Sequence, residues 1–316
     1  MVDTILEVNG LKKYFQTPKG LLYAVDDVTF TVGRGKTLGL VGESGCGKST
    51  TGRAVLRLIE PTAGEVIFEG QDITKYDKKQ VIALRKDMQI IFQDPFSSLD
   101  PRMSVGQIIA EPITLNKILK KRSDVEQRVT ELMDVVGLAS RLINSYPHEL
   151  DGGRRQRIGI ARALALEPKF IVCDEPVSAL DVSIQAQILN LLKQLQEEMG
   201  LTYIFITHNL SVVNHFSDDI AVMYLGKVIE KAPAERLFEK PIHPYTQALL
   251  SAIPVPDLDY KKERIILKGE IVSPINLPNE CRFAPRCIHT QPECRSGIPP
   301  LVEVEPNHFV ACQLAL

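Results

Sequence analysis

The fold of this chain is built around the stretch Gly42-Glu43-Ser44-Gly45-Cys46-Gly47-Lys48-Ser49, which Thr50 follows. It matches the pattern G-x-x-x-x-G-K-[ST] of a phosphate-binding loop. The apolar run at 37–41 predicts a buried strand before the loop, and the apolar spacing over 49–60 predicts an amphipathic helix after it. Glycines let the backbone curve around an anion, and loop amides and a helix N-terminus direct positive partial charge at phosphate. The stretch therefore predicts a polyphosphate site.

Two side chains of this loop carry the chemistry. Lys48 is expected to reach the β- and γ-phosphates of a nucleotide, and the Ser49 hydroxyl is expected to ligate Mg²⁺. The alternative is a glycine-rich turn that happens to contain a lysine. The strand and the helix predicted on either side favour the phosphate loop.

The composition is that of an ordinary globular protein: 316 residues, 44% hydrophobic and 24% charged. The net charge of -2 gives no electrostatic reason to expect a nucleic-acid partner. No apolar run approaches the roughly 20 residues needed to span a bilayer, so any membrane role is expected to run through a partner. The N-terminus lacks the apolar region of a signal peptide, which indicates the cytosol.

An antiparallel β-lobe is predicted over residues 5–32, where short apolar runs alternate with turns. Tyr14 and Phe15 lie in this lobe, just before a turn at 17–20. An aromatic ring here could stack on a nucleotide base. The alternative is that both rings pack within the lobe.

Three predicted strands end in polar residues that suit catalysis. The strand at 88–92 ends at Gln93, which could reach a metal or an attacking water. The strand at 170–173 is closed by Asp174, suited to Mg²⁺, and by Glu175, which can polarise a water. The strand at 203–207 ends at His208, where parallel sheets place their ligands. For Gln93 and His208, an ordinary loop or structural role is the alternative.

Between these strands the pattern turns helical. Ser123 and Glu126 have the spacing of a capping box, apolar residues follow on one face, and Gly137 ends the predicted helix. We interpret this stretch as a helical subdomain inserted into an α/β core. Further on, Gly152 and Gly153 precede another helix and form a second anion-receptive terminus.

Together these elements make the chain from about Leu6 to Ile229 resemble the ATPase subunits of ABC transporters. The shared motifs, in the order of the family, are the Walker A loop (42–49), Gln93 of the Q-loop, the signature segment (150–154), the Walker B strand ending at Asp174-Glu175, the D-loop (178–181) and the switch His208. The resemblance implies an α/β P-loop NTPase (RecA-like) core in a nucleotide-binding domain at 1–240, with the helical subdomain at about 94–160.

The same resemblance implies roles for individual residues. Catalysis would fall to Glu175, His208, Gln93 and Lys48. Mg²⁺ would be held by Ser49, Gln93 and Asp174. ATP would be bound by Phe15 at the base, by residues 42–50, Gln93 and Asp174, and by the signature residues Asp151, Gly152 and Gly153 acting on a nucleotide of the opposite subunit.

The remainder of the chain narrows the resemblance. His243-Pro244-Tyr245-Thr246, followed by a Pro-rich tail with four cysteines, is similar to the dipeptide/oligopeptide importer ATPases. In that family two related ATPase chains pair beneath two membrane-spanning permease subunits, and an extracellular solute-binding protein delivers the peptide. The resemblance thus implies a peripheral protein on the cytoplasmic side of the cell membrane.

One motif departs from the family. The signature usually reads Leu-Ser-Gly-Gly-Gln, whereas this chain has Leu150-Asp151-Gly152-Gly153-Arg154. Asp151 would place a carboxylate near the γ-phosphate, and like charges repel strongly in a dry site. Arg154 could compensate by pairing with Asp151 or with the phosphate.

The C-terminal extension at 241–316 contains Cys281, Cys287, Cys294 and Cys312, separated by five, six and seventeen residues. Four thiolates suit structural Zn²⁺ or an iron–sulfur cluster. The Pro-rich tail from about Asp257 has few large apolar residues to bury, so a metal would stabilise it. The family interpretation is a [4Fe-4S] cluster. Zinc, disulfides and free thiols are the alternatives.

The leading hypothesis is therefore ATP hydrolysis that powers the uptake of dipeptides or oligopeptides. Related importers for nickel, glutathione or opines use similar ATPases, and the solute is chosen by other subunits. A soluble ABC ATPase is a rival of another class, although such proteins usually carry paired cassettes or long coiled-coil insertions. A regulatory subunit that binds ATP without hydrolysing it is a second rival, against which Lys48, Asp174, Glu175 and His208 argue.

Overall fold

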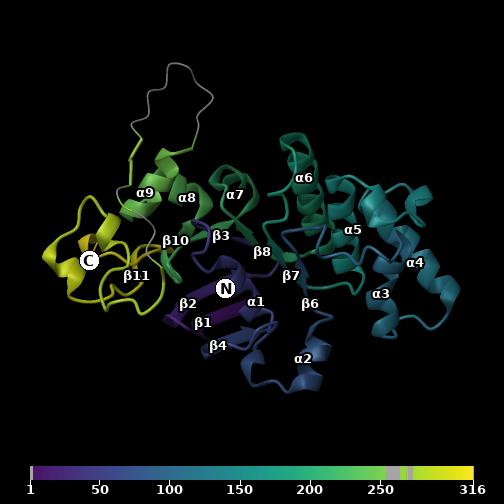
Figure 1. The fold of residues 1–316 in the computed structure, drawn as a ribbon, viewed down its shortest axis with the longest axis horizontal. Coiled ribbons are helices and arrows are strands. Elements are labelled where there is room, and N and C mark those ends of the chain that lie inside the picture. Colours follow the sequence, from purple (N-terminus) through teal and green to yellow (C-terminus); the bar gives the residue numbers. More distant parts are fainter. Residues whose placement is uncertain (1–2, 254–263, 268, 270–272, 316) are drawn as a thin grey trace, which may run out of the picture. The chain divides into compact units, whose positions relative to one another are not determined.

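The structure is a computed structural model and describes residues 3–253, 264–267, 269 and 273–315. The chain divides into two compact units (Figure 1). The first unit consists of Met1–Lys75 and Phe205–Leu316, and the second of Tyr76–Ile204.

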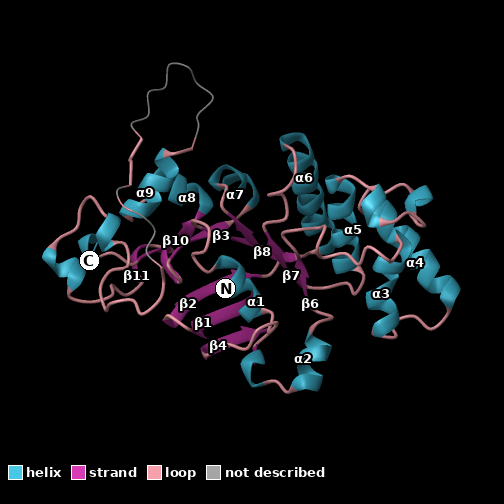
Figure 2. Ribbon diagram, in the orientation of Figure 1, coloured by secondary structure: helices cyan, strands magenta, loops and turns pink. Residues whose placement is uncertain are grey.

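An antiparallel sheet forms one layer of the first unit, with the strand order β2-β1-β4-β5. Figure 2 shows β1, β2 and β4 side by side. The strands are β1 (Thr4–Thr17), β2 (Gly20–Gly33), β4 (Ala63–Phe68) and β5 (Gln71–Asp72). Alternate residues such as Leu6 and Val8 are fully buried, as a half-buried strand requires. This confirms the antiparallel lobe predicted for residues 5–32.

The phosphate-loop strand lies in the second sheet of this unit. β3 (Thr37–Val41) is buried along its whole length and runs parallel to β9 (Asp219–Tyr224). The predicted strand–loop–helix order is confirmed, because α1 (Lys48–Val55) follows the loop. The helix is shorter than the predicted 49–60, since Arg57 takes a left-handed backbone conformation with φ of 53°.

The C-terminal part of the chain adds to the same sheet. β10 (Lys227–Pro233) pairs antiparallel with β9 on one edge and with β12 (His308–Val310) on the other, and β11 (Val302–Glu305) pairs with β12. Besides α1, the described residues of this unit form the helices α7 (Leu210–Phe216), α8 (Ala234–Glu239) and α9 (Pro244–Ser251) and the short 3₁₀ turns η1 (Ile73–Lys75), η4 (Ala284–Arg286), η5 (Pro292–Arg295) and η6 (Gln313–Ala315).

The second unit is mainly helical. Its two strands, β6 (Met88–Ile91) and β7 (Phe170–Asp174), are parallel. Its helices and turns are α2 (Lys78–Leu84), α3 (Val105–Leu115), α4 (Arg122–Val135), η2 (Ser140–Leu142), η3 (Pro147–Glu149), α5 (Gly152–Leu164) and α6 (Val182–Met199). β8 (Thr202–Thr207) carries the chain back to the first unit.

The helix starts show why capping predictions fail locally. α4 begins at Arg122, so Ser123 lies inside the helix and its hydroxyl donates to Asp124 rather than capping. The predicted capping box at Ser123 and Glu126 is wrong, whereas Gly137 does follow the helix end with φ of 68°. Capping boxes occur instead at Asp77, before α2, and at Ser104, before α3.

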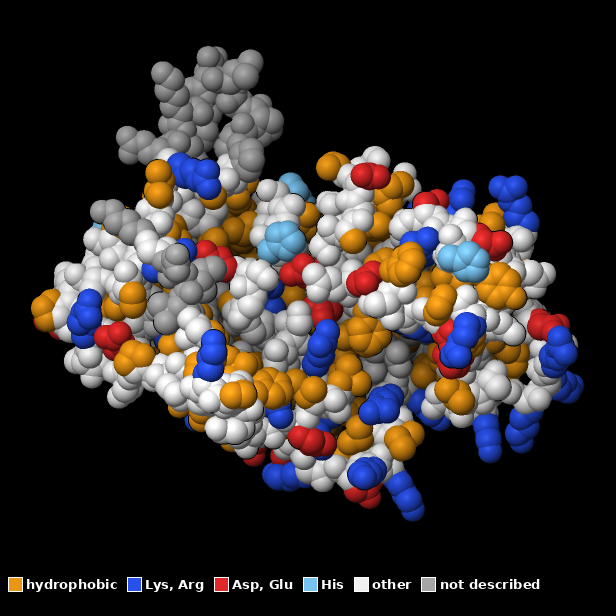
Figure 3. Space-filling view, in the orientation of Figure 1, with side chains coloured by type: hydrophobic (Ala, Val, Ile, Leu, Met, Phe, Trp, Pro, Cys, Tyr) orange, Lys and Arg blue, Asp and Glu red, His pale blue; other side chains and the backbone are white. Residues whose placement is uncertain are grey.

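None of the helices in the described parts of the chain is long and apolar enough to cross a membrane. On the face drawn in Figure 3, Lys and Arg side chains are interspersed with Asp and Glu side chains. This mixed surface agrees with the small net charge of -2.

Candidate nucleotide-binding and hydrolysis site

Glycines shape the phosphate loop where the backbone is tightest. Gly47 is the N-cap residue of α1 with φ of 106°, and a Cβ there would lie 2.1 Å from the carbonyl oxygen of Ala24. Gly42 has φ of 150°, and a Cβ there would lie 2.2 Å from the carbonyl oxygen of Met223. Both positions exclude a side chain, so the loop passes close to the surrounding backbone before it enters the helix.

Lys48 is held over the loop that precedes it. Its side chain is buried, and its ammonium donates to the carbonyl oxygens of Gly42 at 2.9 Å and Glu43 at 3.0 Å. Beside it, burial raises the pKa of the Cys46 thiol, which therefore stays neutral. The position of the lysine thus depends on where the backbone of residues 42–43 is placed.

Glu43 makes contacts that sequence reasoning did not anticipate. Its backbone N–H donates to the hydroxyl oxygen of Tyr245 at 3.0 Å, and its carboxylate accepts two hydrogen bonds from Arg286 at 2.8 and 3.2 Å. The motif around Tyr245 was visible in the sequence, but nothing in its pattern indicated a partner in the loop. Arg286 had no sequence signal.

The two candidate base-stacking aromatics have different surroundings. The Tyr14 hydroxyl donates to Asp26, its ring meets that of Tyr23 edge-on at 4.8 Å, and burial raises its pKa. Phe15 is 37% exposed and carries the Lys13 ammonium 4.8 Å from its ring centroid. Tyr14 is therefore a packing residue of the lobe, and Phe15 presents the accessible ring.

In the second unit, Gln93 and Glu175 meet. Gln93 follows β6 and Glu175 follows β7, and because these strands are parallel neighbours their carboxyl ends lie at one edge. Gln93 Nε2 donates to Glu175 Oε2 at 3.0 Å. The structure thus brings together two residues that the sequence placed 82 positions apart.

The backbone at Glu175 is unusual. Its φ of 47° lies in the left-handed region, which costs a residue with a Cβ roughly 1–2 kcal/mol. The D-loop supports this conformation, because the N–H and hydroxyl of Ser178 both donate to the Glu175 carbonyl at 3.2 and 3.1 Å. Next to it, Asp174 is only 1% exposed at the end of β7. Strained backbone that surrounding contacts maintain is typical of functional sites.

The signature segment begins α5. Asp151 is the N-cap residue: one carboxylate oxygen accepts the Arg154 N–H at 2.8 Å, and the other lies 3.5 Å from Arg154 Nη1. A Cβ at Gly153 would lie 2.7 Å from the Ile184 side chain, and one at Gly152 would lie 3.1 Å from that of Leu180. Asp151 therefore takes over the capping task that a serine hydroxyl performs.

His208 is exposed directly after β8, as the sequence predicted. The next turn is fixed by Asn209, whose N–H donates to Thr207 and whose side chain accepts from the Ser211 N–H, both at 3.0 Å. His208 and Lys48 belong to the first unit, whereas Gln93, Glu175 and Asp151 belong to the second.

The four C-terminal cysteines are neighbours. The Cys281 N–H donates to the Cys294 carbonyl at 2.9 Å. Burial raises the pKa of the Cys281 and Cys312 thiols. Cys294 and Cys312 add to the increase at Cys281, and Cys287 and Cys294 add to it at Cys312. All four are free thiols. Within the described ranges, however, no three His, Cys, Asp or Glu side chains are arranged to hold a metal ion, so this geometry does not support the predicted metal staple.

The chain is similar to known proteins along its whole length. Residues 25–178 match the family described as ABC transporter, and residues 229–294 match the C-terminal region of the oligopeptide/dipeptide transporters. Two relatives from Bacillus subtilis (strain 168) are the oligopeptide transport ATP-binding proteins AppF and OppF. Each is 51% identical over 99% of this chain, and the match covers 98% and 97% of the respective relative.

Solved structures are similar over the larger part of the chain. The ATP-binding cassette MJ0796, in a dimeric post-hydrolysis state bound to ADP and Pi, has a TM-score of 0.67 at 28% identity, covering 73% of this chain and 99% of that protein. The cbiO1 protein of Clostridium perfringens, part of the cbiONQ complex, has a TM-score of 0.67 at 29% identity, covering 75% and 92%.

Proposed function

Because this chain belongs to the ABC transporter family, among its oligopeptide transport ATP-binding proteins, we propose that it hydrolyses ATP to drive the import of dipeptides or oligopeptides. It has the α/β fold of an ABC ATPase cassette. The observation that supports hydrolysis best is the Gln93–Glu175 hydrogen bond beside the buried Asp174. The peptide cargo is supported by the match at 229–294.

In this proposal Glu175 is the general base. Its carboxylate takes a proton from the attacking water, while Gln93 holds the carboxylate in place through its amide N–H. The left-handed backbone at Glu175 fixes the direction in which its side chain leaves the strand. His208, at the end of β8, is proposed to contact the γ-phosphate or the water.

Nucleotide binding is assigned to the phosphate loop. Backbone amides of residues 42–50 would bind the phosphates, Lys48 would reach the β- and γ-phosphates, and the exposed ring of Phe15 would stack on the base. The Ser49 hydroxyl and the Asp174 and Gln93 oxygens are donors of the hard type that Mg²⁺ prefers, so the residue types fit this ion. Bound Mg²⁺ neutralises phosphate charge.

The signature residues are proposed to act on another subunit. Asp151, Gly152 and Gly153 would face the γ-phosphate of ATP bound to a second, related ATPase chain. That pair would dock on two membrane-spanning permease subunits at the cytoplasmic side of the membrane, and an extracellular binding protein would supply the peptide. No part of this proposal involves nucleic acid.

Transport is tested by deleting the gene for this chain and measuring uptake of a labelled dipeptide, a labelled tetrapeptide and ⁶³Ni²⁺. Wild-type protein should restore uptake of the peptides and leave nickel uptake unchanged, and Glu175→Gln should not restore peptide uptake. Restoration of nickel uptake alone would replace the proposed cargo. Unchanged peptide uptake after deletion, with no other ATPase gene compensating, would contradict the proposal.

We further propose that the chain divides into a nucleotide-binding domain (1–240, helical subdomain about 94–160) and an extension (241–316). We also propose that the four cysteines of the extension bind a [4Fe-4S] cluster or zinc. The residue types fit a thiolate site. Their arrangement in the described residues does not, so no step of the proposed hydrolysis depends on a metal at the four cysteines. Iron and zinc analysis of anaerobically purified protein tests it: about four irons, lost in Cys287→Ser, would support the cluster, one zinc the alternative, and neither metal would leave four thiols.

A further inference from the structure

We propose that the C-terminal part of the chain positions the phosphate-binding loop through Glu43, and that Arg286 and Tyr245 are positioning residues for nucleotide binding. The inference rests on the proposed role of residues 42–50 in binding ATP. It adds a task for the extension that requires no metal. It also assigns a function to Glu43, a residue at a variable position of the loop motif.

Both the backbone and the side chain of Glu43 bind residues from the C-terminal part of the chain. Its N–H donates to Tyr245, 202 residues away, and its carboxylate accepts a two-pronged ion pair from Arg286, 243 residues away. Its carbonyl oxygen accepts from the Lys48 ammonium at 3.0 Å. Glu43 thus connects the C-terminal part of the chain directly to the lysine of the loop.

The ion pair between Arg286 and Glu43 is largely shielded from solvent. The side chain of Arg286 is 8% exposed and that of Glu43 is 24% exposed. Pairing with Glu43 raises the pKa of Arg286, so the guanidinium stays charged. Bidentate guanidinium–carboxylate pairs fix geometry as well as adding energy. Removing one partner leaves a poorly solvated charge, which disfavours this arrangement of the loop.

Tyr245 is equally well fixed. It is fully buried, with ring centroids of Tyr224 at 4.8 Å and Phe283 at 5.4 Å. Phe283 lies directly before η4, the turn that carries Arg286. The aromatic cluster of Tyr224, Tyr245 and Phe283 therefore contains one residue that binds Glu43 and directly precedes the turn that carries the other, Arg286.

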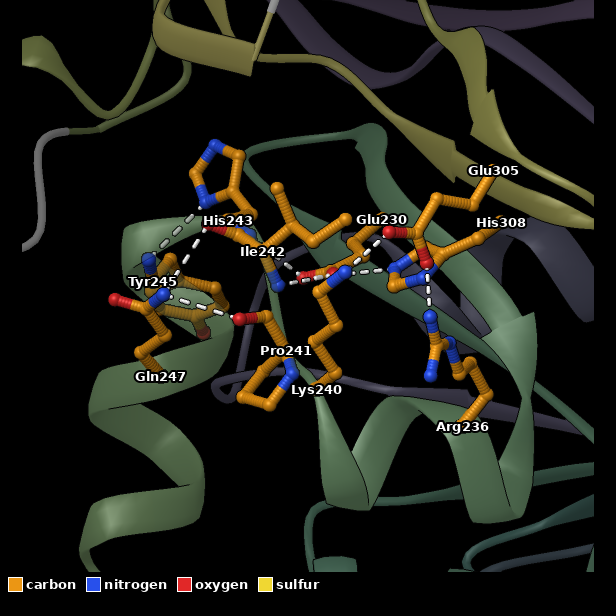
Figure 4. A network of polar contacts seen from close by, with 10 residues as sticks. All are labelled: Glu230, Arg236, Lys240, Pro241, Ile242, His243, Tyr245, Gln247, Glu305 and His308. Carbon is orange, nitrogen blue, oxygen red and sulfur yellow. Dashed lines mark hydrogen bonds and ion pairs between the residues drawn. The ribbon is translucent and has the colours of Figure 1, made fainter.

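A buried polar network anchors the helix of Tyr245 (Figure 4). His243 caps α9: its Nδ1 accepts the Tyr245 N–H at 3.1 Å, and its own N–H donates to Glu230 at 3.0 Å. Glu230 is completely buried and contacts His308 Nε2 at 2.7 Å. Since Glu230 is on β10 and His308 on β12, the network ties α9 to two paired strands.

The same C-terminal turn reaches the loop at a second point. Arg282 donates to the Leu225 carbonyl and to the Asp26 carboxylate. Next to Leu225, the Gly226 N–H donates to the Cys46 carbonyl at 2.8 Å. The segment around Arg282 and Arg286 therefore supports both the start and the middle of the phosphate loop.

Loss of the contacts to Glu43 should affect ATP binding more than the rate of hydrolysis. If Glu43 shifts, the carbonyl oxygens that hold the Lys48 ammonium shift with it, and so do the loop amides. The Lys48 ammonium and the loop amides are proposed to bind phosphate in the ground state as well as in the transition state. Loss of the contacts should therefore raise the Kd and KM for ATP and leave kcat nearly unchanged.

The test measures the affinity of the full-length chain for a fluorescent ATP analogue with Mg²⁺, and KM and kcat in the assembled transporter. Arg286→Gln should raise Kd about 5- to 20-fold. Arg286→Lys, which keeps the charge but not the two-pronged geometry, should have a smaller effect. The double variant Glu43→Gln/Arg286→Gln should be no weaker than Arg286→Gln alone, since both remove one interaction. Arg128→Gln, the same change at an arginine that pairs with Glu131 and Glu167 in the second unit, is the matched control.

Two results would overturn the inference: a Kd for Arg286→Gln within twofold of wild type, or an equal increase in Arg128→Gln. If Arg286→Gln does not fold, Tyr245→Phe decides, because it removes only the hydroxyl that accepts from Glu43. An unchanged Kd in folded Tyr245→Phe would then reject the proposal. Lys48→Ala tests the nucleotide site separately from its positioning by Arg286 and Tyr245. Nucleotide binding that survives in this variant would contradict the proposed site itself.

Discussion

Gln93 Nε2 donates a hydrogen bond to Glu175 Oε2 at 3.0 Å across the carboxyl ends of two neighbouring parallel strands. The amide N–H holds the carboxylate that we propose as the general base. The contact also links the residue proposed to activate water to the Q-loop, which begins at Gln93.

Glu175→Gln should therefore lower the turnover number by about two or more orders of magnitude while ATP still binds. An amide at position 175 can accept the same hydrogen bond from Gln93 but cannot take the proton. ATPase assays of the assembled transporter, with nucleotide affinity measured in parallel, check this. Near-wild-type activity in this variant would remove Glu175 from the role of base.

Two glycines of the phosphate loop should respond differently to alanine. A Cβ at Gly47 would lie 2.1 Å from a backbone oxygen, whereas one at Gly45 meets nothing within 4 Å, although both have positive φ. Gly47→Ala should reduce the free energy of unfolding and abolish nucleotide binding. Gly45→Ala should cost only about 1–2 kcal/mol, the strain of its backbone angle. Chemical denaturation compares them, and equal destabilisation would contradict the contact at Gly47.

The substituted signature predicts two unequal ATP sites in a heterodimer. The Asp151 carboxylate has no hydroxyl to donate, and loss of one such donor typically costs about 100-fold or more in rate. Its ion pair with Arg154, both side chains being half exposed, relieves only part of the repulsion towards phosphate. Blocking Glu175 in this chain should therefore abolish most hydrolysis, and the equivalent change in the partner should leave most of it.

The control for this asymmetry is Asp151→Ser, which restores a hydroxyl and keeps a good N-cap. It should raise the rate of the weaker site. Equal losses from the two Walker B changes, together with no gain from Asp151→Ser, would show that the Asp151–Arg154 pair compensates itself.

Acid should destabilise the fold through His243. Burial lowers the pKa of His243 to about 4, although Glu230 opposes this, whereas the unfolded residue titrates near its ordinary value of 6.5. Between these values the unfolded chain binds a proton that the folded chain does not. Stability should therefore rise with pH across this window, by up to about 1.4 kcal/mol per pH unit, and level off above it.

His243→Asn keeps an acceptor for the Tyr245 N–H and has no titrating ring. Denaturation between pH 4.5 and pH 7 should show a shallower dependence for this variant than for wild type. The same slope in both proteins would mean that another group dominates.

Local pattern was enough for the parts of the site that are contiguous in the chain. The phosphate loop, its strand and its helix depend on neighbouring residues, and so do the strand ends at Gln93, Asp174 and His208. Helix boundaries were less predictable: Ser123 has capping spacing, yet α4 begins before it. Capping is worth only about 1 kcal/mol, which packing of the following apolar face readily outweighs.

Only the tertiary structure distinguishes the surroundings of Tyr14 from those of Phe15. The Tyr14 hydroxyl donates to Asp26, whereas the ring of Phe15 is exposed. The same holds for Arg286 and Glu43. Phe283, just before Arg286 in the chain, packs against Tyr224 and Tyr245, and this packing lies beside the contact between two residues 243 positions apart. Sequence periodicity reports which residues face a core. It carries no record of which distant charge will be buried beside which, since that is settled when the sheets assemble and desolvate both groups together.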